Sequence, residues 1–321
     1  MTNYNTPKVL LTGAFGNIGQ HTLEALLHKN YAVRAFDLDT PDNRKRARKF
    51  NTEVVFGNIV YPDAVTDAVK GVDAVVHLAA IIPPKSEHDP NFSYTVNVRG
   101  TRNIVKAMKQ HGTAHLVYAS SVAVHGCSHH RPCLSIDDPF EKTNCYTEQK
   151  ITCEWELDQE SIAKTILRFG AVIPLERKPD PLMFEVSLDA KIETVHPDDA
   201  ALAAANAVLN SKAEDKKYFI GGGADFQMTY RQFLTRALEN LGIGMLPDTA
   251  FSDDLFHTNY MDTAEAQHDL KFQNHSFQDF LDDVRKAQGC GIHLLKIPFM
   301  RSLVRQNLLK LSPYYTQTES L

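Results

Sequence analysis

The 321-residue sequence predicts an α/β fold in which a doubly wound parallel sheet is followed by a small C-terminal lobe. In the first half of the chain, short apolar runs alternate with longer helical patterns, the order of a parallel sheet with helices on both faces. This alternation stops after Arg168. The contents of 43% hydrophobic and 23% charged residues are those of a globular chain that buries a large core.

Strands and helices are expected to alternate through the first half. The strands are short runs rich in Val, Ile and aromatic residues, which favour extended backbone. They cover residues 9–12, 32–37, 53–56, 74–78 and 115–119. The helices between them cover residues 18–29, 63–69 and 94–110, and a helix at 146–161 and a strand at 164–168 follow.

The second half is expected to complete the sheet and add a lobe. Residues 171–191 contain three prolines and are expected to form loops. The later elements are helices at 197–210, 230–241 and 276–286, a strand at 217–220 and a turn at 221–223. We therefore divide the chain into a sheet domain (1–170, with 192–220 returning to it), a lobe (171–191 and 221–288) and a tail (289–321).

Charge and cysteine content argue against several classes of protein. With 34 Lys and Arg against 39 Asp and Glu, the net charge is −5, which predicts no nucleic-acid partner. The five cysteines are odd in number and form no CxxC pair, so we expect a reducing compartment, the cytoplasm. The first residues lack a signal-peptide pattern, and no run of about 20 apolar residues could span a membrane.

A glycine-rich turn follows the first expected strand and opens the first helix. It reads Thr12-Gly13-Ala14-Phe15-Gly16-Asn17-Ile18-Gly19. In this setting the first glycine permits the tight turn, the second the approach of a pyrophosphate, and the third close helix–sheet packing. The N–H groups and positive dipole end of the helix attract phosphates. The segment predicts a Rossmann-type dinucleotide site, and the alternative is a simple tight turn.

An acidic residue, Asp37, ends the second expected strand. At about 20 residues beyond the glycines, an acid hydrogen-bonds the adenosine ribose hydroxyls, and its charge repels the extra phosphate of NADP. We therefore expect NAD rather than NADP. The alternatives are a solvent-facing Asp, or binding of a 2′-phosphate by the basic run that follows, although such runs are more often a solvated helix face. That run comprises Arg44, Lys45, Arg46 and Arg48.

A tyrosine and a lysine four residues apart, Tyr146 and Lys150, share one face of an expected helix. A neighbouring ammonium lowers the pKa of a phenol, which would make Tyr146 a usable base. Ser120 and Ser121 end the fifth strand, at the sheet edge where ligands bind. By itself the Tyr/Lys pair could be two exposed residues. Together with the glycine turn and a strand-end serine, it predicts a catalytic set.

These motifs and their order resemble those of the short-chain dehydrogenase/reductase superfamily, in particular its extended branch, the NAD-dependent epimerase/dehydratase family. The resemblance spans about residues 7–286. Besides the residues above, it rests on Gly57-Asn58-Ile59, His77-Leu78-Ala79-Ala80, Asn97-Val98-Arg99-Gly100-Thr101, Arg168 and Val195-His196-Pro197-Asp198-Asp199-Ala200.

The resemblance implies a cofactor site built from the glycine turn and the strand ends. Asn58 and Ile59 would contact the adenine, residues 78–80 would line the pyrophosphate and nicotinamide ribose, and Asn97 would support the cofactor side of the site. The complete expected set is Gly13, Phe15, Gly16, Asn17, Ile18, Gly19, Asp37, Asn58, Ile59, Leu78, Ala79, Ala80, Asn97, Ala119, Tyr146, Lys150 and Val172.

The resemblance also implies a reaction, the reversible oxidation of a secondary alcohol to a ketone. Ser121 would hydrogen-bond the substrate oxygen, with Ser120 as the alternative. Tyr146 would move the proton, and Lys150 would bind the nicotinamide ribose. The expected protein is an NAD(P)-dependent oxidoreductase that acts on a small-molecule substrate. A homodimer through the helices around 94–110 and 146–161 is implied as well.

Departures from the family pattern narrow the expected substrate. Val122-Ala123-Val124 follows Ser121 where the 4,6-dehydratases carry an acidic pair, so that branch is disfavoured. The segment after Arg168 is shorter than the one sugar-nucleotide enzymes use, which favours a small or apolar substrate. Gln149 replaces the usual Ser, a lesser change. The alternatives are a sugar-nucleotide epimerase and, in another class, a non-catalytic cofactor-binding sensor or scaffold.

A histidine- and cysteine-rich segment, residues 125–133, contains five potential metal ligands. Their spacing matches no familiar zinc framework, so we expect a surface or substrate-lining loop and no metal site. His125 or His129 could instead contact the substrate.

Three further positions carry structural expectations. His196 is either a hydrogen-bonded structural residue or a substrate contact. Asp198 and Asp199 are expected to cap the helix that follows them. Trp155 and Phe169 are expected to be packing residues.

The tail, residues 289–321, is a basic amphipathic segment beyond the resemblance. Such a segment can lie on an anionic membrane surface, as a peripheral contact. Amphipathic helices more often serve a core, so we favour a helix that packs on its own body or on a partner. Pro298 would break or restart the helix. The basic residues are Lys296, Arg301, Arg305 and Lys310.

Overall fold

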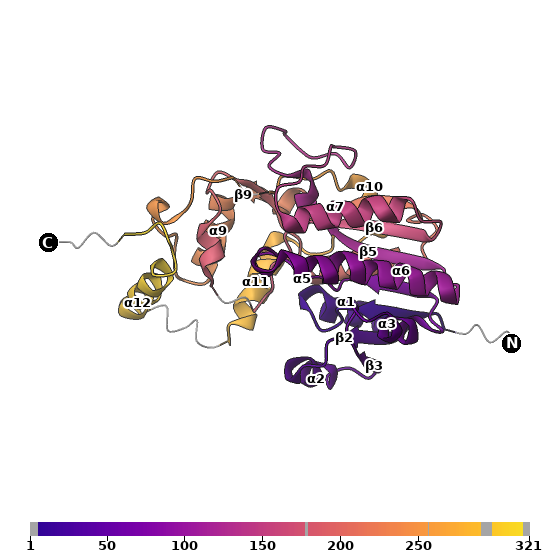
Figure 1. Cartoon of the computed structure of the whole chain (residues 1–321). Helices are drawn as coiled ribbons and strands as arrows, with labels where there is room; N and C mark the ends of the chain where they lie inside the picture. The colour runs from indigo at the N-terminus through magenta and orange to yellow at the C-terminus, as the bar shows by residue number, and fades with distance from the viewer. Residues whose placement is uncertain (1–5, 177–178, 256, 290–296, 317–321) are drawn as a thin grey trace.

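A seven-stranded sheet is the largest feature of the computed structural model, which describes residues 6–176, 179–255, 257–289 and 297–316 (Figure 1). All its neighbouring strands are parallel, in the order β3-β2-β1-β4-β5-β6-β8. The expected fold class is confirmed, and each strand begins and ends within two residues of its expected bounds. The strands are β1 (Lys8–Thr12), β2 (Ala32–Asp37), β3 (Glu53–Phe56), β4 (Ala74–His77), β5 (His115–Ser121), β6 (Ala163–Phe169) and β8 (Lys216–Ile220).

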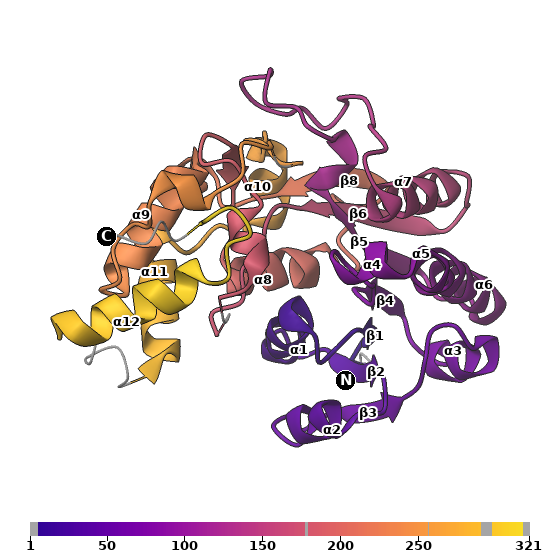
Figure 2. The same cartoon turned by 60° about the vertical axis from the view of Figure 1, so that its left-hand side comes forward.

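Helices cover both faces of this sheet (Figure 2). On one face, α1 (Asn17–His28) packs against α8 (Pro197–Ala207), whose many alanines are fully buried. On the other face lie α3 (Pro62–Val69), α6 (Gly100–His111) and α7 (Cys145–Asp158). Since water reaches neither face, the central strands are continuous apolar runs rather than alternating ones.

The order of the strands fixes where a ligand can bind. The chain starts at β1 in the middle of the sheet, runs outward to β3, and then returns to β4 on the other side of β1. The crevice at the carboxyl ends of β1 and β4 is therefore the switch point of the sheet, where open α/β folds bind ligands. The glycine turn follows β1, Asp37 ends β2, and residues 120–121 end β5, all at this edge.

A second hydrophobic core lies beside the sheet, in the lobe. It is built from a two-stranded antiparallel sheet, β7 (Lys191–Glu193) and β9 (Gln227–Thr229), and from α9 (Tyr230–Asn240) and α11 (Phe277–Ala287). Phe226, Phe233, Phe277 and Phe280 contribute a cluster of aromatic rings to it. We keep the division at 171–191 and 221–288 as a proposal, with two changes. β7 includes residues 192–193, which were assigned to the sheet domain, but it pairs with β9 in the lobe. α10 (Ala264–Leu270) packs with the core of the sheet, against α8 and β8.

The described part of the tail forms a helix that lies on the lobe. α12 (Pro298–Leu309) starts at Pro298, as expected of a proline that restarts a helix. Leu308 is buried in the core of the lobe, and Arg301 and Arg305 donate to the carbonyl oxygen of Ile243. Residues 290–296 and 317–321 of the expected tail lie outside the described residues. Within the described ranges, no helix is long and apolar enough to cross a membrane.

Other elements differ from expectation. The helix expected at 94–110 begins earlier and has a π-helical turn in its middle. Trp155 was expected to pack but is 64% exposed, because α7 buries its opposite side, with Tyr146 and Lys150, against the sheet. Phe169 is buried, as expected. The remaining elements are α2 (Pro41–Ala47), α4 (Lys85–His88), α5 (Pro90–Tyr94), η1 (Thr95–Arg99), η2 (Val122–His125), η3 (Pro181–Phe184), η4 (Ala224–Phe226) and η5 (Asp248–Ala250).

Candidate active site

The glycine turn between β1 and α1 has the close contacts that glycine alone permits. Gly13 has a φ of +69°, and a Cβ atom there would lie 2.9 Å from the amide nitrogen of Ala79. A Cβ atom on Gly19 would lie 2.0 Å from the carbonyl oxygen of Gly13. Gly16 is the N-cap of α1; no side chain caps the helix, and its first turn has no acidic residue. The N-terminus of α1 therefore offers N–H groups and a positive dipole end to an anionic ligand.

Asp37 lies directly against this turn. Its Oδ2 accepts a hydrogen bond from the amide of Phe15 at 2.8 Å, and its Oδ1 accepts one from the amide of Leu38 at 2.7 Å. Arg46 also reaches the turn, where its Nη1 donates to the carbonyl oxygen of Phe15 at 2.6 Å. The basic run is thus not simply a solvated face. Arg44 by contrast pairs with Asp39 at the surface.

Other expected cofactor residues follow the carboxyl ends of β3 and β4, at the same edge of the sheet. Ile59 is buried against Gly100, and residues 78–80 follow β4 beside Gly13. Asn17 donates to the carbonyl oxygen of Val172 at 3.1 Å, which joins the start of α1 to the segment that follows β6.

Asn97, in the π-helical turn, holds the backbone that follows β4. Its Oδ1 accepts from the amide of Ile81 at 2.7 Å, and its Nδ2 donates to the Ile81 carbonyl at 2.8 Å. The same Nδ2 donates to Oε1 of Gln149 at 2.7 Å, and Nε2 of Gln149 donates to the hydroxyl of Ser93 at 2.8 Å. Asn97 therefore supports the wall of the crevice, and Gln149 ties that wall to α7.

The expected catalytic residues come together at the end of β5. The hydroxyl of Ser121 lies close enough to the phenol of Tyr146 to lower its pKa. Lys150 is buried, with its Nζ 2.6 Å from the carbonyl oxygen of Ala119 and 5.8 Å from the ring centre of Tyr146. Ser120 turns the other way and donates to Glu154 at 2.5 Å. Of the two serines, only Ser121 therefore faces the phenol.

Burial controls the protonation of this set. It raises the pKa of Tyr146 to about 12, although the hydroxyl of Ser121 acts in the opposite direction. Burial lowers the pKa of Lys150 to about 8. The sequence reasoning predicted a lowered tyrosine pKa from the neighbouring ammonium. In the folded protein the pKa of Tyr146 is raised instead, because water is excluded from the phenol.

The protonation of Lys150 leads to a testable effect on stability. A buried ammonium whose folded pKa of about 8 lies below its ordinary 10.5 destabilises the fold by about 3 kcal/mol or less. This penalty is fully present below pH 8 and disappears as the pH rises toward 10.5. We expect Lys150→Met to unfold at a higher temperature than wild type at pH 7, and the gap to narrow as the pH rises from 8 to 10. Thermal unfolding followed by circular dichroism measures both. A gap that widens with pH would contradict the buried-ammonium account.

Several residues around the catalytic set were not singled out from sequence. Glu87 accepts hydrogen bonds from the amides of Cys145 and Tyr146, both at 3.1 Å, and so holds the first turn of α7. No local pattern marks Glu87, which precedes Tyr146 by 59 residues in the sequence. Glu154 forms a fully buried ion pair with Arg168 at 2.8 Å. Its place four residues after Lys150, on the same helix face, was a usable signal.

The 125–133 segment lies close to this region, but two of its three histidines, His125 and His129, bond to the polypeptide. Arg168 donates to Nε2 of His125 at 3.1 Å, and the other ring nitrogen of His125 bonds to the carbonyl of Pro139. Nδ1 of His129 accepts from the amide of Lys191 at 3.2 Å. These contacts favour the interpretation of the 125–133 segment as a loop held by bonds to the rest of the chain.

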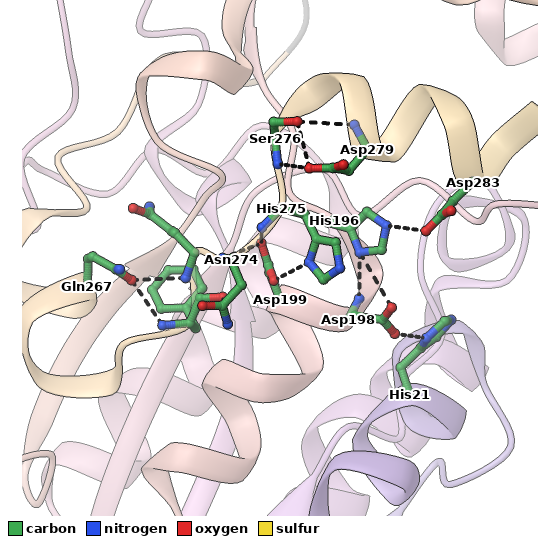
Figure 3. Close-up of polar contacts among 12 residues, drawn as sticks. His21, His196, Asp198, Asp199, Gln267, Asn274, His275, Ser276, Asp279 and Asp283 are labelled. Atoms are coloured by element: carbon green, nitrogen blue, oxygen red, sulfur yellow. Dashed lines mark hydrogen bonds and ion pairs between the residues drawn. The ribbon is translucent and has the colours of Figure 1, made fainter.

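The start of α8 differs from expectation (Figure 3). The N-cap is His196, whose Nδ1 accepts from the amide of Asp198 at 3.2 Å, so the prediction that Asp198 and Asp199 cap the helix was wrong. The carboxylates of Asp198 and Asp199 do not cap the helix because each is hydrogen-bonded to a histidine on another part of the chain. Asp198 bonds His21 on α1, and Asp199 bonds His275 ahead of α11.

A parallel Rossmann-like sheet with a glycine turn at its switch point defines a dinucleotide-binding class of protein. Residues 9–174, about half of the chain, match the model of the NAD dependent epimerase/dehydratase family, and the chain belongs to this family. The family resemblance drawn from the sequence is thereby confirmed.

Known proteins are similar over different parts of the chain. Human sterol-4-alpha-carboxylate 3-dehydrogenase, decarboxylating, is 28% identical over 57% of this chain, which spans about half (49%) of that protein. The 2-alkyl-3-oxoalkanoate reductase of Stenotrophomonas maltophilia is 28% identical over 73% of this chain and 76% of its own length. The solved UDP-glucose 4-epimerase of Thermus thermophilus in complex with NAD superposes with a TM-score of 0.74, at 21% identity, over 88% of this chain and 99% of that one.

Proposed function

We propose that this protein is an NAD-dependent oxidoreductase that moves hydride between the cofactor and a secondary alcohol or ketone. The observation that carries the proposal is the cluster at the end of β5, where Ser121 and the buried Lys150 lie beside Tyr146. This cluster lies at the same sheet edge as the glycine turn. A proton-transfer group and a dinucleotide site on one edge are what alcohol oxidation requires.

The residues around the turn fit NAD. The uncapped N-terminus of α1 would bind the pyrophosphate, and Asp37 would bind the adenosine ribose. Residues 58–59 and 78–80, with Asn97 and Val172, would form the walls. When bound, NAD supplies the acceptor or donor of hydride.

The chain's own residues would handle the proton. Ser121 would hold the substrate oxygen, and Tyr146 would accept the hydroxyl proton at its phenol oxygen. For this, the pKa of about 12 must fall. Lys150, with its Nζ 5.8 Å from the ring centre of Tyr146, is the chain's own positive charge that favours the phenolate. Lys150 would also bind the nicotinamide ribose.

A small or apolar substrate is our proposal for the second reactant. The segment between β6 and β7 is short, which leaves little chain to hold a nucleoside diphosphate. Two relatives are named for a sterol carboxylate and a 2-alkyl-3-oxoalkanoate, which carry extensive hydrocarbon. The epimerases among the relatives keep a sugar-nucleotide epimerase as the second candidate.

Substrate screening with NAD separates these candidates. We expect NADH to accumulate when the protein is mixed with NAD and apolar 3-hydroxycarboxylates or 3-hydroxysteroids, followed at the nicotinamide absorbance. UDP-glucose should give neither NADH nor UDP-galactose. Formation of UDP-galactose without net NADH would favour the epimerase instead. No turnover of either class, with NADH still bound, would favour the cofactor-binding scaffold.

Cofactor choice is expected to depend on Asp37. NADH should bind more tightly than NADPH, and Asp37→Ala should weaken NADH binding on the order of tenfold or more, because a hydrogen bond to a charged group is lost. Nicotinamide fluorescence gives both dissociation constants. Asp39→Ala is the matched control, since Asp39 is exposed and pairs only with Arg44 among its described contacts. A preference for NADPH would overturn this role and direct attention to Arg46.

We also propose a homodimer through α6 and α7. Their outer surfaces form a pocket of about 220 Å³, and ion pairs join the two helices at Arg102–Glu156 and join α6 to the segment after α7 at Lys109–Glu160. Sedimentation equilibrium should give twice the chain mass of 36.0 kDa. A single-chain mass at micromolar concentration would contradict the dimer.

Liposome co-sedimentation with and without residues 289–321 tests the membrane contact of the tail, and equal partitioning would rule it out.

A further inference from the structure

A cavity lies in the lobe where the end of α9 meets α11 and α12, three helices that Figure 2 shows side by side. Its volume is about 750 Å³, within the range of about 300–1,000 Å³ typical of small-molecule sites. Three arginines line it, Arg285 on α11 and Arg301 and Arg305 on α12. None of the residues expected to bind cofactor or substrate lies among its described lining residues, so it is separate from the candidate active site.

The charge of this cavity is not balanced by the residues around it. Glu239 is the only acidic residue among the described ones that line it. Neither Glu239 nor any of the three arginines forms an ion pair within the described part of the chain. Elsewhere in the lobe Arg231 does form one, with Asp248 at 2.8 Å. Three like charges in one cavity repel one another, and a bound anion would turn this repulsion into attraction.

The walls of the cavity are held in place by hydrogen bonds between its helices. Nδ2 of Asn240, at the end of α9, donates to the carbonyl oxygen of Leu281 on α11 at 2.7 Å. Nε of Arg301 and Nη1 of Arg305 both donate to the carbonyl oxygen of Ile243, at 3.1 and 3.0 Å. A guanidinium has more N–H donors than these bonds use. The bonds therefore orient the two arginines and leave donors for a ligand.

We propose that this cavity binds a phosphate-bearing anion, held by Arg285, Arg301 and Arg305. A phosphate suits this set because its oxygens can accept charge-assisted hydrogen bonds from the forked donors of more than one arginine. Met245 and Pro298 add an apolar wall beside the arginines, where an organic part of the ligand could lie. The proposal does not depend on the proposed redox reaction.

The phosphate could belong to a soluble molecule or to the headgroup of an anionic phospholipid. On the outer side of α12, Phe299 is 74% exposed and Leu303, one turn later, is 41% exposed. Their neighbours in sequence, Pro298 and Ser302, line the cavity. A headgroup in the cavity would bring a membrane surface against these apolar side chains, whereas a soluble phosphate would leave them in water.

The test uses the full chain, titrated with inorganic phosphate by calorimetry and co-sedimented with phosphatidylcholine vesicles with and without phosphatidylglycerol. We expect binding of phosphate, of the phosphatidylglycerol vesicles, or of both. Arg285→Gln should weaken it on the order of tenfold or more, because a hydrogen bond between charged groups is lost. Arg285 makes no hydrogen bond or ion pair within the described ranges, so this variant should keep the wild-type unfolding temperature. Arg231→Gln removes the same charge from the same lobe outside the cavity and should bind as wild type does.

Phe299→Ser separates the two sources of the phosphate. For a lipid headgroup, this variant should sediment less with phosphatidylglycerol vesicles while its affinity for inorganic phosphate stays the same. For a soluble ligand, phosphate should bind and no vesicle should sediment the protein. The proposal is overturned if neither probe binds, if Arg285→Gln binds as wild type does, or if Arg231→Gln weakens binding equally. NADH affinity should be the same in all three variants, so a failure of the dinucleotide site is recorded separately.

Discussion

Tyr146→Phe should reduce kcat by roughly 10²–10⁴-fold while the affinity for NADH stays within a few-fold of wild type. The substitution removes only the phenol oxygen, which lies beside Ser121 and is the proposed point of proton transfer. The ring stays in place, so the packing of α7 on the sheet is kept. Initial rates with a substrate that wild type turns over, and a parallel NADH titration, measure the two quantities.

Tyr118→Phe is the matched control for this result. Tyr118 is also a buried tyrosine near the same lysine, with its hydroxyl 3.4 Å from Nζ of Lys150. It lies on β5 and is not hydrogen-bonded to Ser121 in any described contact. We expect its kcat to fall by less than tenfold. A Tyr146→Phe protein that retains more than a tenth of wild-type kcat would remove Tyr146 from the proposed chemistry.

The second large effect is expected at the glycine turn, in Gly19→Ala. The new Cβ atom would lie 2.0 Å from the carbonyl oxygen of Gly13 and 2.8 Å from the carbonyl carbon of Ala14. Backbone cannot move aside as a flexible side chain does, so the turn must open. We expect a loss of about 1–3 kcal/mol in the free energy of unfolding, the usual cost of overpacking, together with loss of NADH binding. Chemical denaturation and fluorescence titration measure these effects.

Gly16→Ala distinguishes the binding role of the turn from its packing role. A Cβ atom on Gly16 would approach only the carbonyl oxygen of Gly13, at 3.2 Å, so the fold should lose little stability. If the pyrophosphate lies against this backbone, the methyl group blocks it, and NADH binding should weaken as it does in Gly19→Ala. Unchanged NADH affinity in a stable Gly16→Ala protein would contradict the proposed position of the pyrophosphate.

The strands and the main helices of the sheet domain could be predicted because their information is local. Val and Ile runs followed by helical patterns specify each β-α unit, and the glycine turn identifies β1 as the first strand. α2 was missed although Thr40 and Pro41 are a regular helix start, because its seven residues show no apolar period. Trp155 was placed inside because residue type alone does not say which face of α7 is buried.

The candidate site was predictable where a motif carries it and not where contacts join distant segments. Tyr146 and Lys150 are four residues apart on one helix, and the two serines lie at the end of a strand, so local patterns mark all four residues. Glu87 holds the start of α7 from another part of the chain. The shift in the pKa of Tyr146 was predicted in the wrong direction, because the depth of burial is a property of the packed structure.

The central claim is that the edge of the sheet around Gly13 and Asp37 is an NAD site. Titration of the purified wild-type protein with NADH, followed by nicotinamide fluorescence and displaced with NAD, tests it most directly. We predict saturable binding of one NADH per chain, competitive with NAD and tighter than that of NADPH. A wild-type protein that is folded by circular dichroism but gives no saturable signal with either dinucleotide would contradict the account.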